Sequence, residues 1–570
     1  KYIIIISKAQ QVGRLKGHLI YKVLATEFLP LREKPLRDLD EDNYLNLLKD
    51  FLKSSSMYFS YSLDLTNTFQ RQSKADQSSP LWKLTDDRFF WNHFIQDDLI
   101  EFCNRGTWQH PGQQLAASPY ILPVIFGMVN IKSTSIKNTH LTLALITRRS
   151  RYRAGTRYFS RGIDEHGNVS NFNETEQILV LNDSASGLGG FGGDDNLLNE
   201  KCRGSPKEFQ ILSFSQTRGS VPIYWAEVNT LNYIPRLQIR GVEAAIPAAR
   251  AHFEEQIRLY GDNYLVNLVK QAGREREIKE AYEKIFNILT SHVPSSKRPE
   301  SYQGEKLSTE PKHHGHIMDQ LHYIYFDFHR ETKGLKWDRT QILLDQLINV
   351  LEVQQYFRSL DMPGDAAQVE VRNQQKGIIR TNCMDCLDRT NVVQSVLARY
   401  VLNRQLIDLD LLNKGENFAS YEKLDSIFRN IWADNADFVS MSYAGTGALK
   451  TDLTRNGNRT IAGMFEDLRN SIIRYVRNNF LDGPKQDAFD LFMGKYTPNI
   501  GSSSVFTDKR PLLVQSIPYI LAFSIFFVLV GIFTRRLPGT VTLPVKIFTL
   551  FWFAVGFWSF IFIYNHGMLY

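Results

Sequence analysis

The spacing of apolar and polar residues along the chain alternates between strand-like and helix-like patterns. Alternating or continuous apolar runs predict strands at residues 2–6, 57–62, 141–147, 158–162 and 323–326. Apolar residues three or four apart predict helices at residues 41–53, 248–271, 339–360 and 391–406. Mixed in this order, strands and helices indicate an α/β or α+β body whose N-terminal part is rich in sheet.

Two long apolar segments follow near the end of the chain. Residues 512–533 and 547–564 contain no charged side chain, and basic residues flank both segments. Each is long enough to cross a bilayer core as a helix, which takes about 17 to 25 residues. A buried hairpin of a globular core is the alternative, and the basic flanks disfavour it. The pattern predicts two transmembrane helices joined by a short lumenal loop, residues 534–546.

The side of the membrane on which the body lies is not set by charge bias, because equal numbers of basic residues precede and follow the first span. The chain has only four cysteines, which suggests a reducing compartment. A lumenal body would also expose glycosylation sequons at Asn168, Asn173, Asn182 and Asn458. We therefore expect a multi-pass membrane protein whose body faces the cytosol.

The body is expected to divide into an N-terminal subdomain, residues 1–118, and a catalytic domain, residues 119–496, with a linker at 497–511 before the spans. The chain opens inside a predicted strand, so we expect the N-terminal subdomain to be truncated. Two polar stretches, residues 183–207 and 295–315, are expected to be surface loops. His313, His314 and His316 end the second stretch; a metal site is an alternative there, but a solvated loop is favoured.

Composition excludes several classes of protein. The chain has 570 residues, 12% of them aromatic, which argues against disorder. Lys and Arg number 67 against 60 Asp and Glu. A body so nearly balanced lacks the basic footprint of a nucleic-acid binder, so no nucleic-acid partner is expected.

The strongest chemical signal is the segment 377–391, in which an apolar strand leads into a compact loop and then an amphipathic helix. Cys383 and Arg389 stand six residues apart in it. Backbone amides of such a loop and the N-terminus of the following helix can bind phosphoryl oxygens, and Arg389 can add a planar, two-pronged contact. The same positive field lowers the pKa of a thiol, so Cys383 can attack phosphorus and form a phosphocysteine.

Cys383 and Cys386 form a Cys-x-x-Cys pair, so a zinc site, a redox pair or a buried structural thiol are alternatives. One such pair cannot fill a tetrahedral zinc site, and Asp385 between the sulfurs is unusual for a redox dithiol. The nucleophile is therefore favoured for Cys383. Cys386 is expected to be a small packed residue that could shield an oxidised Cys383 as a disulfide.

The leaving oxygen needs a proton from a general acid. Asp385 is favoured over Asp388, because helix capping or orientation of Arg389 explains Asp388 without catalysis, and a carboxylate on another loop remains open. Arg380, Asn382, Thr390 and Asn391 are candidates for binding substrate or holding the loop. The remaining candidate substrate-binding residues are Met384, Cys386, Leu387 and Lys450.

The string from Arg380 to Asn391 closely resembles the signature of the Sac-domain phosphoinositide phosphatases. Similar stretches occur at residues 153–158, 171–177, 216–222, 326–329, 432–436 and 443–452, so the resemblance covers most of the body. It implies hydrolysis of inositol-lipid phosphomonoesters through a cysteine, without a metal or other cofactor. The terminal hairpin matches the membrane-anchored member of that family.

That member implies an endoplasmic reticulum and Golgi location, phosphatidylinositol 4-phosphate as substrate with the 3-phosphate and 3,5-bisphosphate as further substrates, and lipid-transfer or membrane-contact proteins as partners. A protein tyrosine phosphatase and a non-catalytic lipid-binding scaffold are the alternative functions.

Overall fold

The computed structural model describes the chain except for residues 1, 32–38, 77, 105–115, 138, 182–208, 233, 292–316, 334–338, 362–368, 458–459, 499–505, 507, 509 and 534–542. Both polar stretches expected as loops, together with His313, His314 and His316, lie outside the described residues. Residues 1–36, 44–225 and 239–497 form one compact unit, the body, and the C-terminal helices belong to a second.

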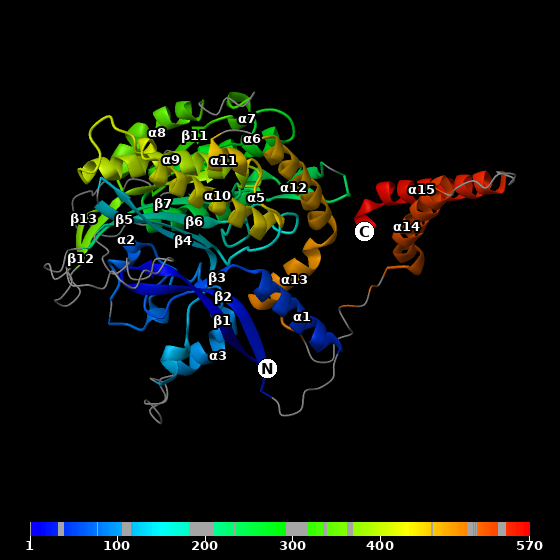
Figure 1. Ribbon diagram of the computed structural model, residues 1–570, viewed down its shortest axis with the longest axis horizontal. Helices are drawn as coiled ribbons and strands as arrows, with labels where there is room; N and C mark the ends of the chain where they lie inside the picture. Colours follow the sequence, from blue (N-terminus) through cyan, green and yellow to red (C-terminus); the bar gives the residue numbers. More distant parts are fainter. Residues whose placement is uncertain are drawn as a thin grey trace, which may run out of the picture. The chain divides into compact units, whose positions relative to one another are not determined.

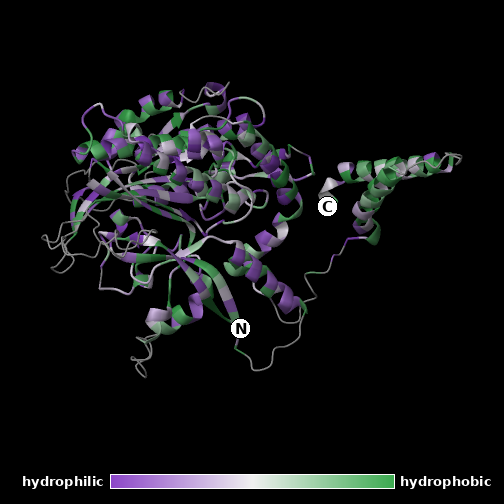
Figure 2. Ribbon diagram, in the orientation of Figure 1, coloured by the Kyte–Doolittle hydropathy of each residue, from purple (hydrophilic) through white to green (hydrophobic). Residues whose placement is uncertain are grey.

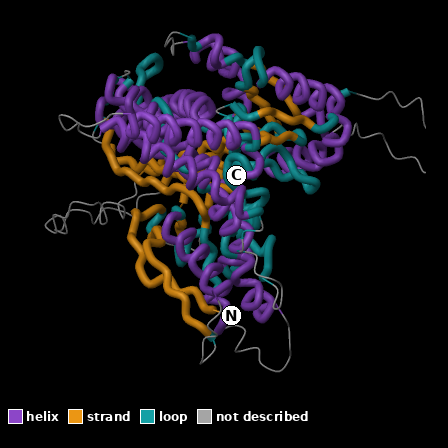
Figure 3. Tube along the Cα trace, turned by 90° about the vertical axis from the view of Figure 1, so that its right-hand side faces the viewer, coloured by secondary structure: helices purple, strands orange, loops and turns teal. Residues whose placement is uncertain are grey.

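One twelve-stranded sheet organises the body (Figures 1 and 3). Its main path runs β1-β2-β3-β4-β5-β6-β7-β14-β10-β11, and β12 pairs with both β13 and β7. The strands are β1 (Tyr2–Leu15), β2 (His18–Pro30), β3 (Met57–Phe59), β4 (Ile125–Ile136), β5 (Thr139–Arg149), β6 (Asn173–Leu181), β7 (Phe209–Arg218), β10 (Asp262–Asn267), β11 (Leu321–Tyr325), β12 (Phe357–Asp361), β13 (Val369–Asn373) and β14 (Gly377–Asn382). β8 (Trp225–Val228) and β9 (Arg236–Ile239) pair separately.

The direction of pairing changes at β7. Strands β1 to β7 pair antiparallel, whereas β7, β14, β10 and β11 run parallel to one another. β7 meets β12 along its first half and β14 along its second half. The carboxyl ends of β7, β14 and β10 therefore lie side by side, which is where ligands bind in parallel sheets.

Helices cover the parallel and central strands (Figure 1). The longer ones are α1 (Leu39–Ser54), α3 (His93–Asn104), α5 (Val242–Tyr260), α6 (Glu275–Thr290), α8 (Thr340–Gln354), α9 (Asp388–Asp408), α10 (Glu422–Ala444), α12 (Ile461–Phe480) and α13 (Asp482–Phe492). Single turns are α2 (Phe69–Gln72), α7 (Phe328–Glu331) and α11 (Thr451–Asn456).

Alternation along β5 shows how both faces of the sheet are buried. Leu143 and Leu145 join a core with side chains of α8, α9 and α10, whereas Ala144 and Ile146 join a second core that includes Ala248 of α5. Successive side chains of a strand point to opposite faces, so a strand covered on both sides is apolar throughout. This explains the unbroken apolar run that predicted it.

Most sequence-based elements are confirmed, with some corrections. The predicted helices 41–53 and 391–406 correspond to α1 and α9. The predicted helices 248–271 and 339–360 are wrong at their C-terminal ends, because α5 ends at Tyr260 before β10 and α8 ends at Gln354 before β12. A short apolar run fits the periodicity of a helix as well as that of a strand, and pairing in the sheet decides which of the two forms. Residues 158–162 form turns instead of the predicted strand.

The predicted spans correspond to α14 (Leu512–Phe533) and α15 (Leu543–Asn565). Both are long and apolar enough to cross a membrane, and Figure 2 colours them as predominantly hydrophobic. They pack closely where small residues meet: a Cβ added at Gly556 would lie 3.0 Å from the Ser524 side chain. Small residues at such a contact let two helices approach within a bilayer. The boundary predicted between residues 118 and 119 remains a prediction; β3 and β4, on either side of it, pair in one sheet.

Candidate active site

The loop that follows β14 lies at the carboxyl ends of three parallel strands. Cys383 comes directly after β14, and α9 begins at Asp388. Arg389 donates to the carbonyl of Leu268, just beyond β10, at 3.1 Å, and Cys386 donates to the carbonyl of Gly219, just beyond β7, at 3.0 Å. The loop is thus fixed to both neighbouring strands.

Cys383 is buried, and its sulfur accepts two hydrogen bonds. The backbone N–H of Cys386 donates to Sγ at 3.1 Å, and the Thr390 hydroxyl donates at 3.4 Å. Burial alone would raise the pKa of this thiol, but a side-chain hydrogen bond with the Cys386 thiol, the charge of Arg389 and the bond from Thr390 together lower it to about 6. At neutral pH this sulfur is a thiolate, the form that attacks electrophiles.

The loop turns back on itself at Cys386, which has a left-handed backbone with φ +52°. That conformation aims its N–H at the Cys383 sulfur, as successive amides do in anion-binding nests. Burial, and the neighbouring Cys383, raise the pKa of Cys386 well above its ordinary value. Cys386 is therefore a neutral, packed thiol, and only Cys383 ionises.

Arg389 is oriented by a carboxylate on another element. Its Nη1 and Nη2 bond to the two oxygens of Glu275, at the start of α6, at 2.9 and 3.0 Å. This bidentate pairing fixes the plane of the guanidinium. Burial would lower the pKa of Arg389, but Cys383 and Glu275 raise it, so the side chain stays cationic beside the thiolate.

Asp385 lies between two arginines of the segment that follows β5. Arg161 approaches its carboxylate at 2.6 Å and Arg157 at 3.1 Å. Although burial acts in the opposite direction, the two guanidinium charges hold the pKa of Asp385 well below its usual range. In this arrangement Asp385 lacks the proton that a general acid donates, so the geometry does not favour the role predicted for it.

Asp388 occupies the first turn of α9 and has the opposite character. It accepts a hydrogen bond from the backbone N–H of Leu449 at 2.8 Å, and Arg474 of α12 lies 3.8 Å from its other oxygen. Burial raises its pKa, more than Arg474 and the Leu449 amide lower it. Of the two carboxyls in the loop string, Asp388 is the one whose surroundings favour a proton.

The other predicted residues divide into structural and peripheral groups. Arg380 and Asn382 are buried in β14, where they bond to the Ser220 carbonyl and to Asn267. Asn391 in α9 bonds to the Trp432 carbonyl. These contacts hold the loop in place. Met384 and Leu387 are buried loop residues, and Lys450 is exposed with its backbone N–H bonded to Asp467.

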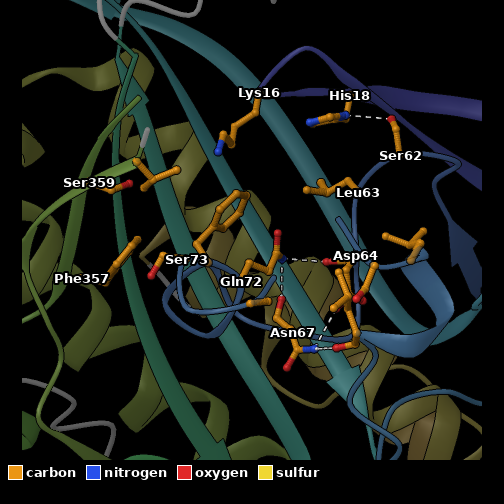
Figure 4. A pocket seen from close by; sticks show the side chains of 16 residues that line it. Lys16, His18, Ser62, Leu63, Asp64, Asn67, Gln72, Ser73, Phe357 and Ser359 are labelled. Carbon is orange, nitrogen blue, oxygen red and sulfur yellow. Dashed lines mark hydrogen bonds between the residues drawn. The ribbon is translucent and has the colours of Figure 1, made fainter. Parts of the chain in front are cut away.

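A separate cavity of about 520 Å³ lies elsewhere in the body. Lys16, His18, Asp64 and Phe357 are among the residues around it, and none of the predicted site residues lines it (Figure 4). Phe357 pairs with Ser213, toward the start of β7, whereas the loop after β14 lies at the other end of that strand.

Within the described ranges, no group of three or more His, Cys, Asp or Glu could hold a metal ion.

Comparison with known proteins identifies the family. Residues 1–333 match the family model described as the SacI homology domain. The chain belongs to the Sac family. Among similar proteins, phosphatidylinositol-3-phosphatase SAC1 of Saccharomyces cerevisiae is 42% identical over 524 residues, which are 91% of this chain and 74% of that protein.

Further Sac-family relatives extend the match. Phosphatidylinositol-3-phosphatase SAC1 of Drosophila melanogaster is 35% identical over 564 residues, covering 97% of this chain and 82% of its own length. Phosphoinositide phosphatase SAC6 of Arabidopsis thaliana is 33% identical over 504 residues, covering 87% and 73%.

Four groups around this Sac-family loop were not predicted as site residues: Arg157, Arg161, Glu275 and Arg474. Each lies far from Cys383 in the sequence and reaches the loop only through the fold. Arg157 belongs to one of the stretches that resemble the family, and this was the one available signal for it. Nothing near Glu275 or Arg474 marks them, because their surroundings read as ordinary polar faces of helices.

Proposed function

We propose that this protein is a membrane-tethered phosphoinositide phosphatase that hydrolyses the phosphomonoester of phosphatidylinositol 4-phosphate through a phosphocysteine. The observation that carries the proposal is the buried Cys383 thiol, whose pKa falls to about 6 beside Arg389. A buried thiolate next to a fixed guanidinium is the arrangement that a cysteine nucleophile needs to attack a phosphate dianion.

The proposed reaction has two steps. In the first, Cys383 Sγ attacks phosphorus in line with the inositol oxygen, the S–P bond forms and the P–O bond breaks. Arg389 and the loop amides stabilise the equatorial oxygens. In the second, water attacks the phosphocysteine, the S–P bond breaks, and inorganic phosphate leaves with the thiolate restored.

We assign the proton for the leaving inositol oxygen to Asp388 rather than Asp385. Burial favours the protonated form of Asp388, whereas Arg157 and Arg161 favour the ionised form of Asp385. Asp385 then positions the two arginines, whose charges add to the positive field of the site. Asp388 could accept a proton from the attacking water in the second step.

The family and the apolar hairpin support an inositol lipid as the proposed substrate. Two of the relatives are named as phosphatidylinositol-3-phosphatases, and a third is named more generally as a phosphoinositide phosphatase. We retain the 4-phosphate as the main substrate of this chain, with the 3-phosphate and 3,5-bisphosphate as further substrates. The apolar hairpin supports action at a bilayer, where tethering raises the effective concentration of enzyme.

We further propose that the chain resides in the endoplasmic reticulum and Golgi with its body in the cytosol. Lipid-transfer and membrane-contact-site proteins are the proposed partners, because they deliver inositol lipids between membranes. If Asn168 and Asn173 carry no glycans in cells, the result agrees with a cytosolic body. Glycans at either position would contradict it.

The test is phosphate release by the full chain reconstituted in vesicles that contain one inositol lipid at a time. Cys383→Ser should abolish release from every lipid, and Cys103→Ser, a thiol outside the loop, should leave it unchanged. Brief incubation with ³²P-labelled lipid should trap label on the wild-type protein. Faster cleavage of phosphotyrosine peptides than of lipid would favour a protein phosphatase, and lipid binding without turnover would favour a scaffold.

A further inference from the structure

Helix α12 exposes its apolar face, whereas an ordinary surface helix exposes its polar face. Its exposed face carries large apolar side chains: Ile461, Met464, Phe465, Leu468, Ile472 and Val476. They are spaced three or four residues apart, so they form one stripe along the helix. Phe465 is 69% exposed, and Leu468 and Ile472 are each 58% exposed.

The face of α12 that contacts the rest of the body is polar instead. Arg474 and Asn478 are buried. Arg474 donates to the Thr446 hydroxyl and the Gly447 carbonyl just after α10. Asn478 donates to the carbonyl of Ala444, the last residue of α10. Soluble helices place the apolar stripe against the core and the polar face toward water. In the reversed arrangement, the polar contacts of α12 hold it on the body without burying the stripe. The stripe is therefore free to contact a surface outside the body.

The same helix contacts the catalytic loop. Arg474 donates to the Thr446 hydroxyl at 3.0 Å and lies 3.8 Å from Asp388. A helix with its side chains is about 10–12 Å across. The loop and the apolar stripe are thus separated by roughly the thickness of one helix, so whatever covers the stripe lies close to the bound substrate.

The surface that fits this stripe is a lipid bilayer. The body ends at Thr497 and the first span begins at Leu512. The intervening 14 residues, 498–511, reach at most about 50 Å at 3.3–3.6 Å per residue. A tether of this length raises the effective concentration of the stripe at the bilayer. A one-sided helix with Phe, Leu and Ile on its apolar face binds in the interface plane of a bilayer.

We propose that α12 is a membrane-docking helix whose stripe inserts into the cytosolic leaflet and orients the catalytic loop toward the lipid head groups. This inference rests on the proposed function, since it takes the substrate to be a lipid of the same bilayer. Docking leaves the chemistry of Cys383 unchanged and acts on access to substrate embedded in the membrane.

The test compares two substrates of one full-length protein reconstituted in vesicles. The variant Leu468→Asp/Ile472→Asp puts two charges in the stripe, and the matched control Ile342→Asp/Val353→Asp puts two charges on exposed apolar positions of α8. The substrates are long-chain phosphatidylinositol 4-phosphate in the vesicle and a water-soluble short-chain analogue. Hydrogen exchange of residues 461–480 in vesicles and in detergent supplies a second readout.

The stripe variant should lose about tenfold or more of its activity on the vesicle substrate, because charges oppose interfacial insertion, and should keep wild-type activity on the soluble analogue. The control variant should match the wild type on both. Wild-type α12 should exchange more slowly in vesicles than in detergent, and the stripe variant should lose that difference.

Several results would overturn docking. Wild-type vesicle activity in the stripe variant would do so, as would equal loss on both substrates, which indicates a purely structural helix. A change of oligomeric state in detergent would assign the stripe to a second copy. Absence of turnover by the wild type on either substrate would instead refute the proposed function, so the two failures are distinguishable.

Discussion

Two clusters of buried charge lie on opposite sides of β7, one on β6 and one on the loop after β14, and they differ in how much of their charge is paired. In the first, Glu174 of β6 is buried and bonds to Arg71, Arg148 and the hydroxyl of Tyr260. The second cluster lies in and beside the loop after β14, and it contains the Cys383 thiolate, Asp385 and Arg389. Both clusters shift pKa values strongly, so burial of charge alone does not mark the active site.

The difference lies in the balance of charge and in exposure. Glu174 is completely enclosed, with its oxygens matched to arginines. At the loop, Arg218 makes one hydrogen bond, to Asn391, and its Nε and Nη1 have no hydrogen-bond partner among the described residues. The side chains of Asp385, Asp388 and Arg389 keep between 21% and 28% of their surface exposed. The Glu174 carboxylate is enclosed and paired, whereas the carboxylates and the arginine of the loop keep part of their surface exposed to an incoming anion.

The largest expected effect tests the open cluster. Arg389→Lys replaces the planar fork with a single point charge and should lower kcat on lipid vesicles by about 10³-fold, in the range seen for loss of a preorganised transition-state contact. The midpoint of urea unfolding should change little, because Arg389 keeps part of its surface in water. Unchanged turnover would contradict the assignment of Arg389 to the phosphate.

The closed cluster should respond in stability instead. Burial raises the pKa of Glu174, but Arg71, Arg148 and Arg88 lower it to about 2. Because this folded-state pKa lies below the ordinary value of 4.5, ionised Glu174 stabilises the fold above about pH 4.5, and the stabilisation disappears as pH falls toward 2. Glu174→Gln should cost about 3 kcal/mol at pH 7 and progressively less below pH 4.5.

Urea unfolding of the full chain in detergent, followed by tryptophan fluorescence from pH 7 to pH 3, measures this cost. Activity per folded molecule should remain that of the wild type. A pH-independent cost would mean that the lost contact is steric and not ionic.

The next effect distinguishes the roles of the two loop carboxyls, Asp388 and Asp385, by the kcat of their variants on two substrates. Asp388→Asn should lower kcat on the lipid by about 10²-fold, the usual size of general-acid catalysis. The loss should shrink on an aryl phosphate, whose leaving group needs no proton. Asp385→Asn should produce a loss of similar size on both substrates, because it disturbs Arg157 and Arg161. The reverse pattern would restore Asp385 as the acid.

The smallest effect is a titration. Alkylation of Cys383 by iodoacetamide should rise with pH through about 6 and flatten above pH 7, so the rate at pH 5 should be about tenfold below the plateau. Inorganic vanadate should protect the thiol. Glu275→Gln should alter this profile, because it frees Arg389 from its orienting carboxylate, whereas Glu174→Gln should leave it unchanged.

The sequence could predict the features that depend on neighbours along the chain. The proposed nucleophile, the arginine proposed to bind phosphate and the loop that carries them fall within 15 residues, and the local order of strand, loop and helix is enough to place them. The spans needed only length and the absence of charge. Strands β10 and β12, which the sequence analysis assigned to the ends of helices, could not be predicted. Pairing partners distant in the sequence decide between the helix and strand periods there.

By itself, then, the sequence determined which cysteine is the candidate nucleophile and where the two long apolar helices lie, since both are encoded in short contiguous runs. Only the tertiary structure decided the state of that chemistry. It brings Arg161 to Asp385, Glu275 to Arg389 and Arg474 to Asp388, and these contacts fix which groups are charged. It also turned the apolar face of α12 outward. The reason is physical: pKa values and exposure depend on distance in space, which separation along a chain does not specify.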